Sequence, residues 1–568
     1  MPGTIKVFVT DTHELAGLGA ARSLGRAGCR VTAGSPDAKR PAVAYSRFTA
    51  EMATYPDPWS DQNRFKDWLA RQAKQYDAVL PVSEAALVAA ADLGNIRAIV
   101  PPAASLPYIL SKRAAVRKAL KAGIRCPETA FDRDAAMDLP LPIIIKTDNR
   151  LTAAGRYLKG RQWYMENRRQ LADLLDDLDR QGDTWIVQRC LPGHGVGAFL
   201  LRWGDRIHIS FAHKRLHEVP FWGGWSSLRE GHDAPELLAD AARLLTATHF
   251  EGAGMVEFRR SGGKDYFLEI NGRLWGSLAL ALHSNADFPK TLLECYLHGA
   301  PVDTPSPSRI GVRCRNIYPG EFGYLTSVLK GRGPVRGVKR PGKIRAVADF
   351  VLPSIRTRGD YFWWSDPLPG LCQGLTGVHS VAGAVADKVL DRLRSLHARM
   401  QATRFLSQCA NRRPALDGAG TVLLLCYGNI CRSPFAEAYW RQKSPGARTV
   451  SAGFHPEPGR QTPQRIVRAG RRWGLDLSRH RSRTILPGDV READAIFVMD
   501  RWNLADLLAR FPEARPKTWL LAGVSGDGEI PDPYFLEEEK ALASLTAIAR
   551  AIDAIFAKTG GNATAPLD

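Results

Sequence analysis

The run VLLLCYGNICRSP at residues 422–434 contains residue types that favour phosphate chemistry. Cys426 precedes Arg432 and Ser433 by six and seven positions, and the run joins an apolar stretch typical of a strand to a segment typical of a helix. A loop in that place directs backbone N–H groups and the positive end of a helix dipole toward one point, where they bind an anion and stabilise a thiolate. Arg432 can donate paired hydrogen bonds to phosphate oxygens, Ser433 can donate to the sulfur, and Asn429 can brace the loop. The run therefore predicts a nucleophilic cysteine inside a phosphate cradle.

Further motifs extend this pattern downstream: SAGF at 451–454, GLDLSRHRSR at 474–483, AIFVMD at 495–500 and DPY at 532–534. With them, residues 420–558 resemble the low-molecular-weight protein tyrosine phosphatases. The resemblance implies that Cys426 attacks phosphorus and that Arg432 holds the phosphoryl oxygens. It also implies that Asp532 protonates the leaving group and then activates water against a phosphocysteine. The implied substrate is a phosphotyrosine protein or a small phosphomonoester, and no cofactor is expected for this reaction.

Two alternatives concern the cysteines of this region. Cys431 either forms a reversible disulfide with Cys426 or is a small buried residue that packs the loop. The arsenate reductases that share this fold need further redox cysteines downstream, and no cysteine follows Cys431 in the sequence. This composition favours the phosphatase interpretation.

A second constellation lies in GMVEFRR at 254–260 and DYFLEINGRLWGS at 265–277. Glu257 and Glu269 fall in two β-rich runs about a hairpin apart, and Asn271 shares a face with Glu269 because strand side chains alternate. Three hard oxygen ligands of this kind suit Mg²⁺ bound to a triphosphate. Arg273 points the same way and can neutralise a transferring phosphoryl group.

These residues resemble the ATP-grasp superfamily, in its carboxylate–amine ligase and carbamoyl-phosphate-synthase-like branch. PIIIKTD resembles the strand that bears the nucleotide-phosphate lysine, here Lys146, and LSKRAAVRKAL resembles the start of the domain with Lys112. GIRCPET at 123–129 matches a common linker, and WIVQRCLPGHG resembles the adenine segment with Gln188. HKRLHEVPFWGGWSS at 213–227 resembles a substrate-side loop of this branch. The resemblance implies that ATP, with Mg²⁺, phosphorylates a small carboxylate and that an amine or thiol then attacks the acylphosphate.

Two departures from the family pattern motivate an alternative. The loop after Lys146 offers only Gly155 and Gly160 where the family often has a glycine-rich phosphate loop, and Arg189 follows Gln188 where an acidic residue is common. The alternative is a non-catalytic module that senses a nucleotide or ligand and regulates the phosphatase. A nicotinamide cofactor is not expected, because Arg22 occupies the third position of the glycine fingerprint.

The pattern of strands and helices expected around these residues predicts an α/β multidomain protein. Residues 1–110 alternate strand-like and helix-like runs and form a Rossmann-like pre-ATP-grasp domain in this interpretation. Residues 111–305 form an α+β ATP-grasp domain, 306–415 a basic connector with an amphipathic helix, and 420–558 a parallel-sheet α/β phosphatase domain.

The connector is the main electrostatic feature of a chain whose net charge is +20, because residues 306–415 hold 19 Lys or Arg against 6 Asp or Glu. Basic residues precede the aromatic run at 361–364, and a helix expected over 380–406 has an apolar side. The helix either packs on a neighbouring domain or helps the basic segment contact an anionic membrane surface. Nucleic acid fits less well, because no recognised binding motif accompanies the charge.

The chain contains neither a long apolar run typical of a membrane span nor a pattern typical of a secretory signal. Its 9 cysteines have no framework spacing, which favours a reducing compartment. We therefore expect a cytoplasmic protein, with peripheral contact at the inner membrane face as the further option.

Overall fold

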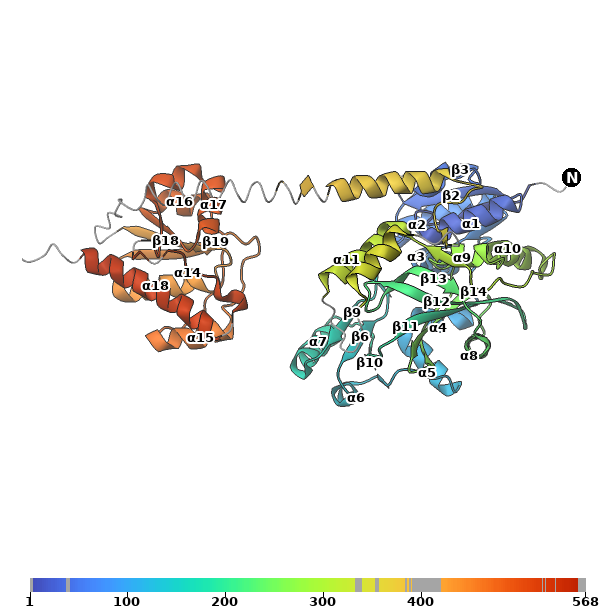
Figure 1. Cartoon of the computed structure of the whole chain (residues 1–568), viewed down its shortest axis with the longest axis horizontal. Coiled ribbons are helices and arrows are strands. Elements are labelled where there is room, and N and C mark those ends of the chain that lie inside the picture. Colours follow the sequence, from blue (N-terminus) through green and yellow to red (C-terminus); the bar gives the residue numbers. More distant parts are fainter. Residues whose placement is uncertain are drawn as a thin grey trace, which may run out of the picture. The chain divides into compact units, whose positions relative to one another are not determined.

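The computed structural model describes residues 4–36, 41–331, 340–352, 357–383, 386–387, 390, 420–523, 525–526, 528–536 and 538–559. The chain divides into two compact units, Met1–Val381 and Ala382–Asp568 (Figure 1). Each unit contains its own sheets and hydrophobic cores. The α/β multidomain class predicted from the sequence is confirmed.

The first unit begins with a four-stranded parallel sheet in the order β3-β2-β1-β4. Its central strand alternates: Val7 and Val9 face a core shared with the first helix, whereas Phe8 faces the aromatic core on the other side. This is the Rossmann-like pattern predicted for the N-terminus. The elements are β1 (Lys6–Val9), α1 (Leu15–Arg26), β2 (Arg30–Pro36), β3 (Glu51–Tyr55), α2 (Gln62–Gln72), β4 (Ala78–Leu80) and α3 (Glu84–Leu93).

A small antiparallel sheet follows in the order β5-β10-β6-β9. Its isoleucine-rich strand buries Ile143 and Ile145 on one face, which leaves Lys146 on the other. A separate short hairpin connects β6 to β9. The elements are α4 (Leu106–Leu110), α5 (Lys112–Lys121), β5 (Thr129–Ala130), α6 (Arg133–Asp138), β6 (Ile143–Thr147), β7 (Arg150–Leu151), β8 (Tyr157–Leu158), β9 (Gln162–Met165), α7 (Arg168–Arg180) and β10 (Trp185–Arg189).

The largest sheet has seven strands in the order β15-β14-β11-β12-β13-β16-β17. Helices α5 and α8 cover one face, and α1, α9 and α10 cover the other, so the first sheet and this sheet share a core. The elements are β11 (His194–Trp203), β12 (Arg206–Val219), β13 (Trp225–Gly231), α8 (Pro235–Ala247), β14 (Gly252–Ser261), β15 (Lys264–Asn271), α9 (Leu278–His283), α10 (Phe288–His298), β16 (Arg313–Arg315) and β17 (Thr357–Gly359).

The first part of the expected connector differs from a linker, because β16 pairs with β13 and β17 pairs with β16. Buried ion pairs fix this part to earlier segments: Arg22 Nε lies 2.8 Å from Asp366 Oδ2, and Arg229 pairs with Asp360. The segment η4 (Ile317–Glu321) leads into α11 (Phe322–Lys330), which packs on α12 (Lys343–Val351), and a further helix covers residues 368–383. Most of the helix expected over 380–406 lies outside the described residues. Within the described part of the chain, no helix is both long enough and apolar enough to cross a membrane.

The second unit is built on a four-stranded parallel sheet in the order β19-β18-β20-β21. Strand β18 is buried on both faces: Val422 and Leu424 face α14, α15 and α18, and Leu423 and Leu425 face α16 and α17. The elements are β18 (Thr421–Cys426), α14 (Arg432–Lys443), β19 (Arg448–Gly453), α15 (Gln464–Gly470), α16 (Pro487–Glu492), β20 (Ala495–Val498), α17 (Arg501–Arg510), β21 (Thr518–Leu520) and α18 (Glu538–Thr559).

Candidate active sites

Cys426 ends the central strand β18, and Arg432 begins α14, so the loop between them lies at the carboxyl edge of a parallel sheet. The backbone N–H of Asn429 points at Cys426 Sγ from 3.2 Å, and Ser433 Oγ lies 3.1 Å from the same sulfur. The loop N–H thus donates to the sulfur, and the Ser433 hydroxyl lies within hydrogen-bond distance of it.

Asn429 holds the loop in shape from a fully buried position with a φ of +49°. Its amide nitrogen donates to Ser433 Oγ at 3.0 Å and to Ser451 Oγ at 2.9 Å, and its amide oxygen accepts from Arg483 N at 2.9 Å. Close packing from β19 adds to this, because a Cβ on Gly453 would lie 2.8 Å from Tyr427 O and 2.9 Å from Asn429 Cβ. Segments beyond the loop therefore fix its conformation.

Arg432 is buried and is held by two carboxylates. Its Nη1 donates to Asp500 Oδ2 at 2.5 Å and to Ile530 O at 2.9 Å, and its Nη2 donates to Asp532 Oδ2 at 2.6 Å. Burial works against the guanidinium charge, but Cys426, Asp500 and Asp532 outweigh it, so the pKa of Arg432 lies above its usual range. The structure thus places Asp532 beside the cradle, with its carboxyl group half-exposed at the mouth.

Asp500 is a site residue that the sequence analysis missed. It follows β20 at the same sheet edge and caps α17, because its Oδ1 accepts from Asn503 N at 2.8 Å. The signal was present in the motif AIFVMD, whose last residue is this aspartate at the end of a buried strand.

Cys431 lies at the start of α14 and is buried. Burial, with a contribution from neighbouring Cys426, raises the pKa of the Cys431 thiol to about 12. Both cysteines carry free thiols in this structure.

The mouth of this site carries aromatic and basic side chains. Tyr427 and Tyr534 are exposed, His455 lies edge-on to Tyr427 with ring centroids 5.8 Å apart, and the Arg465 guanidinium lies 6.0 Å from the Tyr534 ring. A flat aromatic phosphate ester fits such a rim, because aromatic rings stack on one another and cations lie over their faces.

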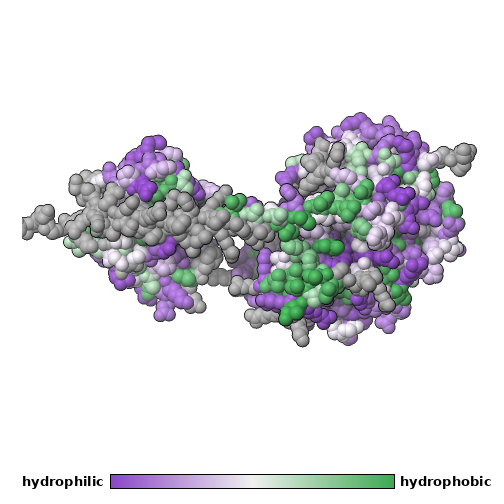
Figure 2. Space-filling model, turned by 45° about the horizontal axis from the view of Figure 1, so that its top comes forward, coloured by the Kyte–Doolittle hydropathy of each residue, from purple (hydrophilic) through white to green (hydrophobic). Residues whose placement is uncertain are grey.

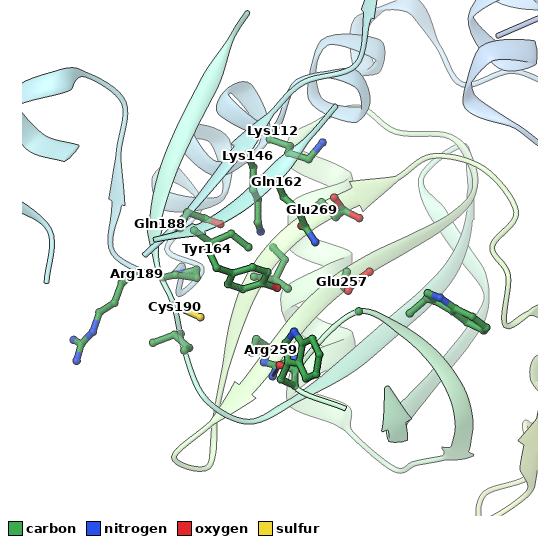
Figure 3. A pocket seen from close by; sticks show the side chains of 18 of the residues that line it. Lys112, Lys146, Gln162, Tyr164, Gln188, Arg189, Cys190, Glu257, Arg259 and Glu269 are labelled. Carbon is green, nitrogen blue, oxygen red and sulfur yellow. Dashed lines mark hydrogen bonds between the residues drawn. The ribbon is translucent and has the colours of Figure 1, made fainter. Parts of the chain in front are cut away.

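The second candidate site is a cavity of about 340 Å³ between the small sheet and the seven-stranded sheet. Figure 3 shows Lys146 and Glu269 pointing into the same space, whereas the Arg189 side chain is turned away from it. Gln188 lines the cavity and donates from Nε2 to Thr129 Oγ1 at 3.1 Å. The sequence-predicted residues that line the cavity are Lys112, Lys146, Gln188, Glu257 and Glu269.

Glu257 and Glu269 lie directly opposite each other in the register of β14 and β15. Burial raises the pKa of Glu257, an effect that Arg215 opposes and Glu269 reinforces. Burial also works against the charge of Glu269, but Lys112 and Lys146 outweigh it, so the pKa of Glu269 lies below its usual range. Burial lowers the pKa of Lys146 itself, and Glu269 opposes this shift. The two opposed carboxylates thus lie beside two lysines in one cavity.

The donor set fits Mg²⁺. Glu257 and Glu269 supply hard oxygen ligands, and Asn271 supplies an amide whose Nδ2 donates to Glu269 Oε1 at 3.3 Å, leaving its carbonyl oxygen for a cation. Among the described residues no group of three His, Cys, Asp or Glu side chains could hold a metal, and Asn271 lies beside Glu269 without lining the main cavity.

Arg273 is placed differently from the other predicted residues, because it does not line the main cavity and its Nη1 donates to Leu274 O at 3.0 Å. Its charge still contributes to the low pKa of Glu269. Arg215, which the sequence analysis did not single out, is in contact with the site: its Nη2 lies 2.8 Å from Glu257 Oε1. Its signal was its position in the segment HKRLHEVPFWGGWSS.

The hairpin β7–β8 occupies the place where a glycine-rich loop is common in ATP-grasp proteins. It is tied to the N-terminal sheet region by two backbone hydrogen bonds, from Gln62 N to Gly155 O at 2.8 Å and from Tyr157 N to Trp59 O at 2.9 Å. Tyr157 also donates to Glu84 Oε1 at 2.7 Å. Contacts with the first domain thus hold a loop that has few glycines of its own.

Residues 421–562 match the family described as low molecular weight phosphotyrosine protein phosphatase, and residues 181–318 match the family described as ATP-grasp in the biosynthetic pathway with Ter operon. The phosphatase Etp of Escherichia coli K12 is 34% identical over 114 residues, which are 20% of this chain and 77% of Etp. The phosphatase Wzb of the same organism is 32% identical over 129 residues, or 23% of this chain and 88% of Wzb. Among solved structures, pyruvate carboxylase of Rhizobium etli aligns with 55% of this chain and 30% of its own, at 17% identity and a TM-score of 0.44.

Through its C-terminal unit, the chain belongs to the low molecular weight phosphotyrosine protein phosphatase family. The N-terminal unit contains the ATP-grasp match, so the two-part interpretation of the sequence is confirmed at the level of families.

Proposed function

We propose that the chain is a bifunctional enzyme with a phosphotyrosine or aryl phosphate monoesterase in its second unit and an ATP-dependent carboxylate–amine or carboxylate–thiol ligase in its first unit. The observation that carries the phosphatase half is the position of Cys426 Sγ, 3.2 Å from a loop N–H and 3.1 Å from Ser433 Oγ, beside the buried Arg432. The observation that carries the ligase half is the opposed pair Glu257 and Glu269 beside Lys146 in one cavity.

In the phosphatase reaction, Cys426 attacks phosphorus while the bond to the ester oxygen breaks and Asp532 gives that oxygen its proton. Arg432 and the loop N–H groups hold the equatorial oxygens. In the second half, the Asp532 carboxylate takes a proton from water, which attacks the phosphocysteine. The sulfur–phosphorus bond then breaks, and Ser433 donates a hydrogen bond to the departing thiolate, so the enzyme returns to its first state with phosphate released.

In the ligase reaction, Lys112 and Lys146 neutralise the triphosphate, and Gln188 borders the nucleotide. Glu257, Glu269 and Asn271 would hold Mg²⁺, which supplies further neutralisation of phosphate charge when bound. A substrate carboxylate attacks the γ-phosphorus of ATP, ADP leaves, and Arg273 stabilises the charge from the edge of the site. An amine or thiol then attacks the acyl carbon and releases phosphate, so the protein acts by positioning and charge neutralisation.

The test uses the full chain with Cys426→Ser, so that the phosphatase does not destroy phosphorylated products. ADP release from Mg-ATP is measured with pools of amino acids and other small carboxylates. The ligase proposal expects one pool to raise ADP release, Glu269→Gln to abolish the rise, and Glu236→Gln, an exposed glutamate on α8, to leave it unchanged.

The alternative, a sensing module, gives a different outcome. The ion pair between Arg215 and Glu257 favours it, because the guanidinium competes with a metal ion for that carboxylate. A sensor would bind ATP without turnover in every pool, and ATP would change the rate of aryl phosphate hydrolysis by the wild-type chain. The phosphatase half is tested separately: Cys426→Ser abolishes hydrolysis of an aryl phosphate, whereas Cys372→Ser in the first unit does not.

A further inference from the structure

Many exposed apolar side chains of the first unit come from η4, α11, α12, the helix at 368–383 and the residues that directly follow α12 or precede that helix. We call this set the exposed apolar surface. Figure 2 shows hydrophobic side chains, in green, gathered on one face of the first unit. Its members are Ile317, Phe322, Leu329, Ile344, Val347, Val351, Leu352, Trp364, Leu368, Leu371, Leu375 and Val378.

Helix α12 turns its apolar side outward. Ile344, Val347 and Val351 follow the i, i+3, i+7 spacing of one helix face, and Ile344 is 88% exposed while Val351 is 63% exposed. The opposite side carries Ala346, which is buried against α11. Within the described part of the chain, α12 thus packs by Ala346 and leaves its branched apolar residues exposed to solvent.

The helix at 368–383 repeats this arrangement. Leu368, Leu371, Leu375 and Val378 share one face by the same spacing, and all four are exposed. The helix contacts the first unit through Gly377, where an added Cβ would lie 2.9 Å from Tyr318 Cγ, and through Gln373, whose Nε2 donates to Tyr318 O at 3.4 Å. Since Tyr318 belongs to η4, which leads into α11, the outward stripes belong to adjoining elements.

The acidic and basic side chains of this region differ in their exposure to solvent. Its acidic residues Glu321, Asp360 and Asp366 are buried, and they pair with His217, Arg229 and Arg22 respectively. Most described cations of the region instead reach solvent, although Arg315 is buried and the partly exposed Asp349 lies among the others. The exposed cations are Lys330, Arg340, Lys343, Arg345 and Arg358.

We propose that the exposed apolar surface docks on an anionic membrane, with its apolar stripes in the headgroup boundary and its cations against the lipid phosphates. Apolar patches larger than a few hundred Å² on a folded unit mark interaction sites. Basic amphipathic helices with aromatic residues are typical of surfaces that lie on membranes, and Trp364 is 84% exposed here. A complementary protein surface would need matching acidic groups, whereas an anionic bilayer supplies negative charge everywhere. The arrangement of these residues thus favours a lipid surface as the occupant.

The test is flotation of the full chain with vesicles of phosphatidylcholine alone or with about one third phosphatidylglycerol, at about 0.05 M and about 0.5 M salt. Binding is expected to the anionic vesicles at low salt and to weaken as salt screens the charges. Each cation near the bilayer contributes about 1 kcal/mol, or about fivefold, so Lys343→Gln with Arg345→Gln should weaken binding about 25-fold. Arg71→Gln with Lys74→Gln, an exposed pair at the C-terminal end of α2 and outside the elements of this surface, is the charge-matched control and should leave binding unchanged.

The apolar contribution is tested with Ile344→Ser, Val351→Ser and Leu375→Ser together, against Leu486→Ser in the second unit. The triple variant should lose binding to anionic vesicles while its melting temperature and aryl phosphate hydrolysis stay as in the wild type. Absence of flotation at low salt, or binding that neither set of variants weakens, would overturn the proposal. A dimer in sedimentation that the triple variant abolishes, without any vesicle binding, would overturn it in favour of a protein interface.

Discussion

Replacing Asp532 by Asn tests the assignment of the general acid most sharply. The amide keeps the shape of the carboxyl group and its oxygen can still accept a hydrogen bond, as Asp532 Oδ2 does from Arg432 Nη2 at 2.6 Å and Oδ1 from Tyr534 N at 3.0 Å. What disappears is a proton that can be transferred. General acid catalysis contributes about 10²–10⁴-fold, so hydrolysis of phenyl phosphate, whose leaving group needs a proton, should slow by that factor. Hydrolysis of 2,4-dinitrophenyl phosphate should change little, because its phenolate leaves unprotonated.

The structure supplies a matched control in Asp500, the other carboxylate on the same guanidinium. Its oxygens accept from Arg432 Nη1 at 2.5 Å and from Asn503 N at 2.8 Å, and its side chain is 15% exposed against 45% for Asp532, so it is the less accessible of the two carboxylates. Asp500→Asn weakens one charge-assisted hydrogen bond by about 1 kcal/mol, which is about fivefold in rate and equal for both esters.

The assay is single-turnover kinetics on the two esters with both variants, which reports the first chemical step. An equal loss on both esters for Asp532→Asn would refute its role as the acid. A leaving-group dependence for Asp500→Asn instead would show that the acid is the other carboxylate.

Three further predictions concern the same unit. Gly453→Ala should lower kcat/KM for aryl phosphates at least about tenfold, because its Cβ would lie 2.8 Å from Tyr427 O and displace the loop. Gly446→Ala is the control, since nothing lies near an added Cβ there, and equal activities of the two variants would contradict the packing argument. Arg432→Lys should lower the free energy of unfolding of this unit by about 3 kcal/mol, because one ammonium group cannot donate to Asp500, Ile530 O and Asp532 together. Calorimetry should show no such loss for Arg441→Lys, whose side chain is exposed. Cys431 should resist iodoacetamide at pH 8, because its thiol stays protonated below its pKa of about 12 and reacts only as the pH approaches that value. Peptide mapping that finds Cys431 alkylated at pH 8 would contradict this prediction.

The arrangement of the loop at 426–433 was predictable because its residues are close together in the sequence. Cys426, Asn429, Arg432 and Ser433 lie within eight consecutive positions, and a strand followed by a helix brings them together. The pairing of Glu257 with Glu269 was accessible for a similar reason, since they lie on two strands joined by the short turn at Gly262 and Gly263. In both cases a short connection between neighbouring elements leaves few possible positions for the side chains on them.

Contacts between distant segments were not accessible in this way. Arg215 reaches Glu257 because Gly195 on the neighbouring strand leaves room for it: a Cβ there would lie 2.6 Å from Arg215 Cδ. That relation depends on the register of β11 and β12, which no local pattern specifies.

The region 306–415 was interpreted as a connector from its proline, glycine and basic composition. Its strands β16 and β17 have three residues each, too few to show a period. The residues that tie it down, Asp360 and Asp366, pair with arginines 131 and 344 positions earlier. The composition of such a segment indicates its solvent-exposed residues, but it does not identify the few buried charged residues that hold the segment against the rest of the unit.

The two candidate sites share a physical constraint, because each contains a buried arginine near two carboxylates. Arg432 pairs with Asp500 and Asp532, and Arg215 pairs with Glu257 at 2.8 Å and lies 3.7 Å from Glu218. A buried guanidinium without a partner costs several kcal/mol, so each site places carboxylates beside its arginine. In the proposed phosphatase mechanism, a phosphoryl oxygen takes the place of Asp532 Oδ2 at Arg432 Nη2, which frees that carboxyl group to face the leaving oxygen. Phosphate binding and placement of the acid are then one event in this mechanism, and Asp532, whose side chain is 45% exposed, is better placed to transfer a proton than Asp500, which is 15% exposed.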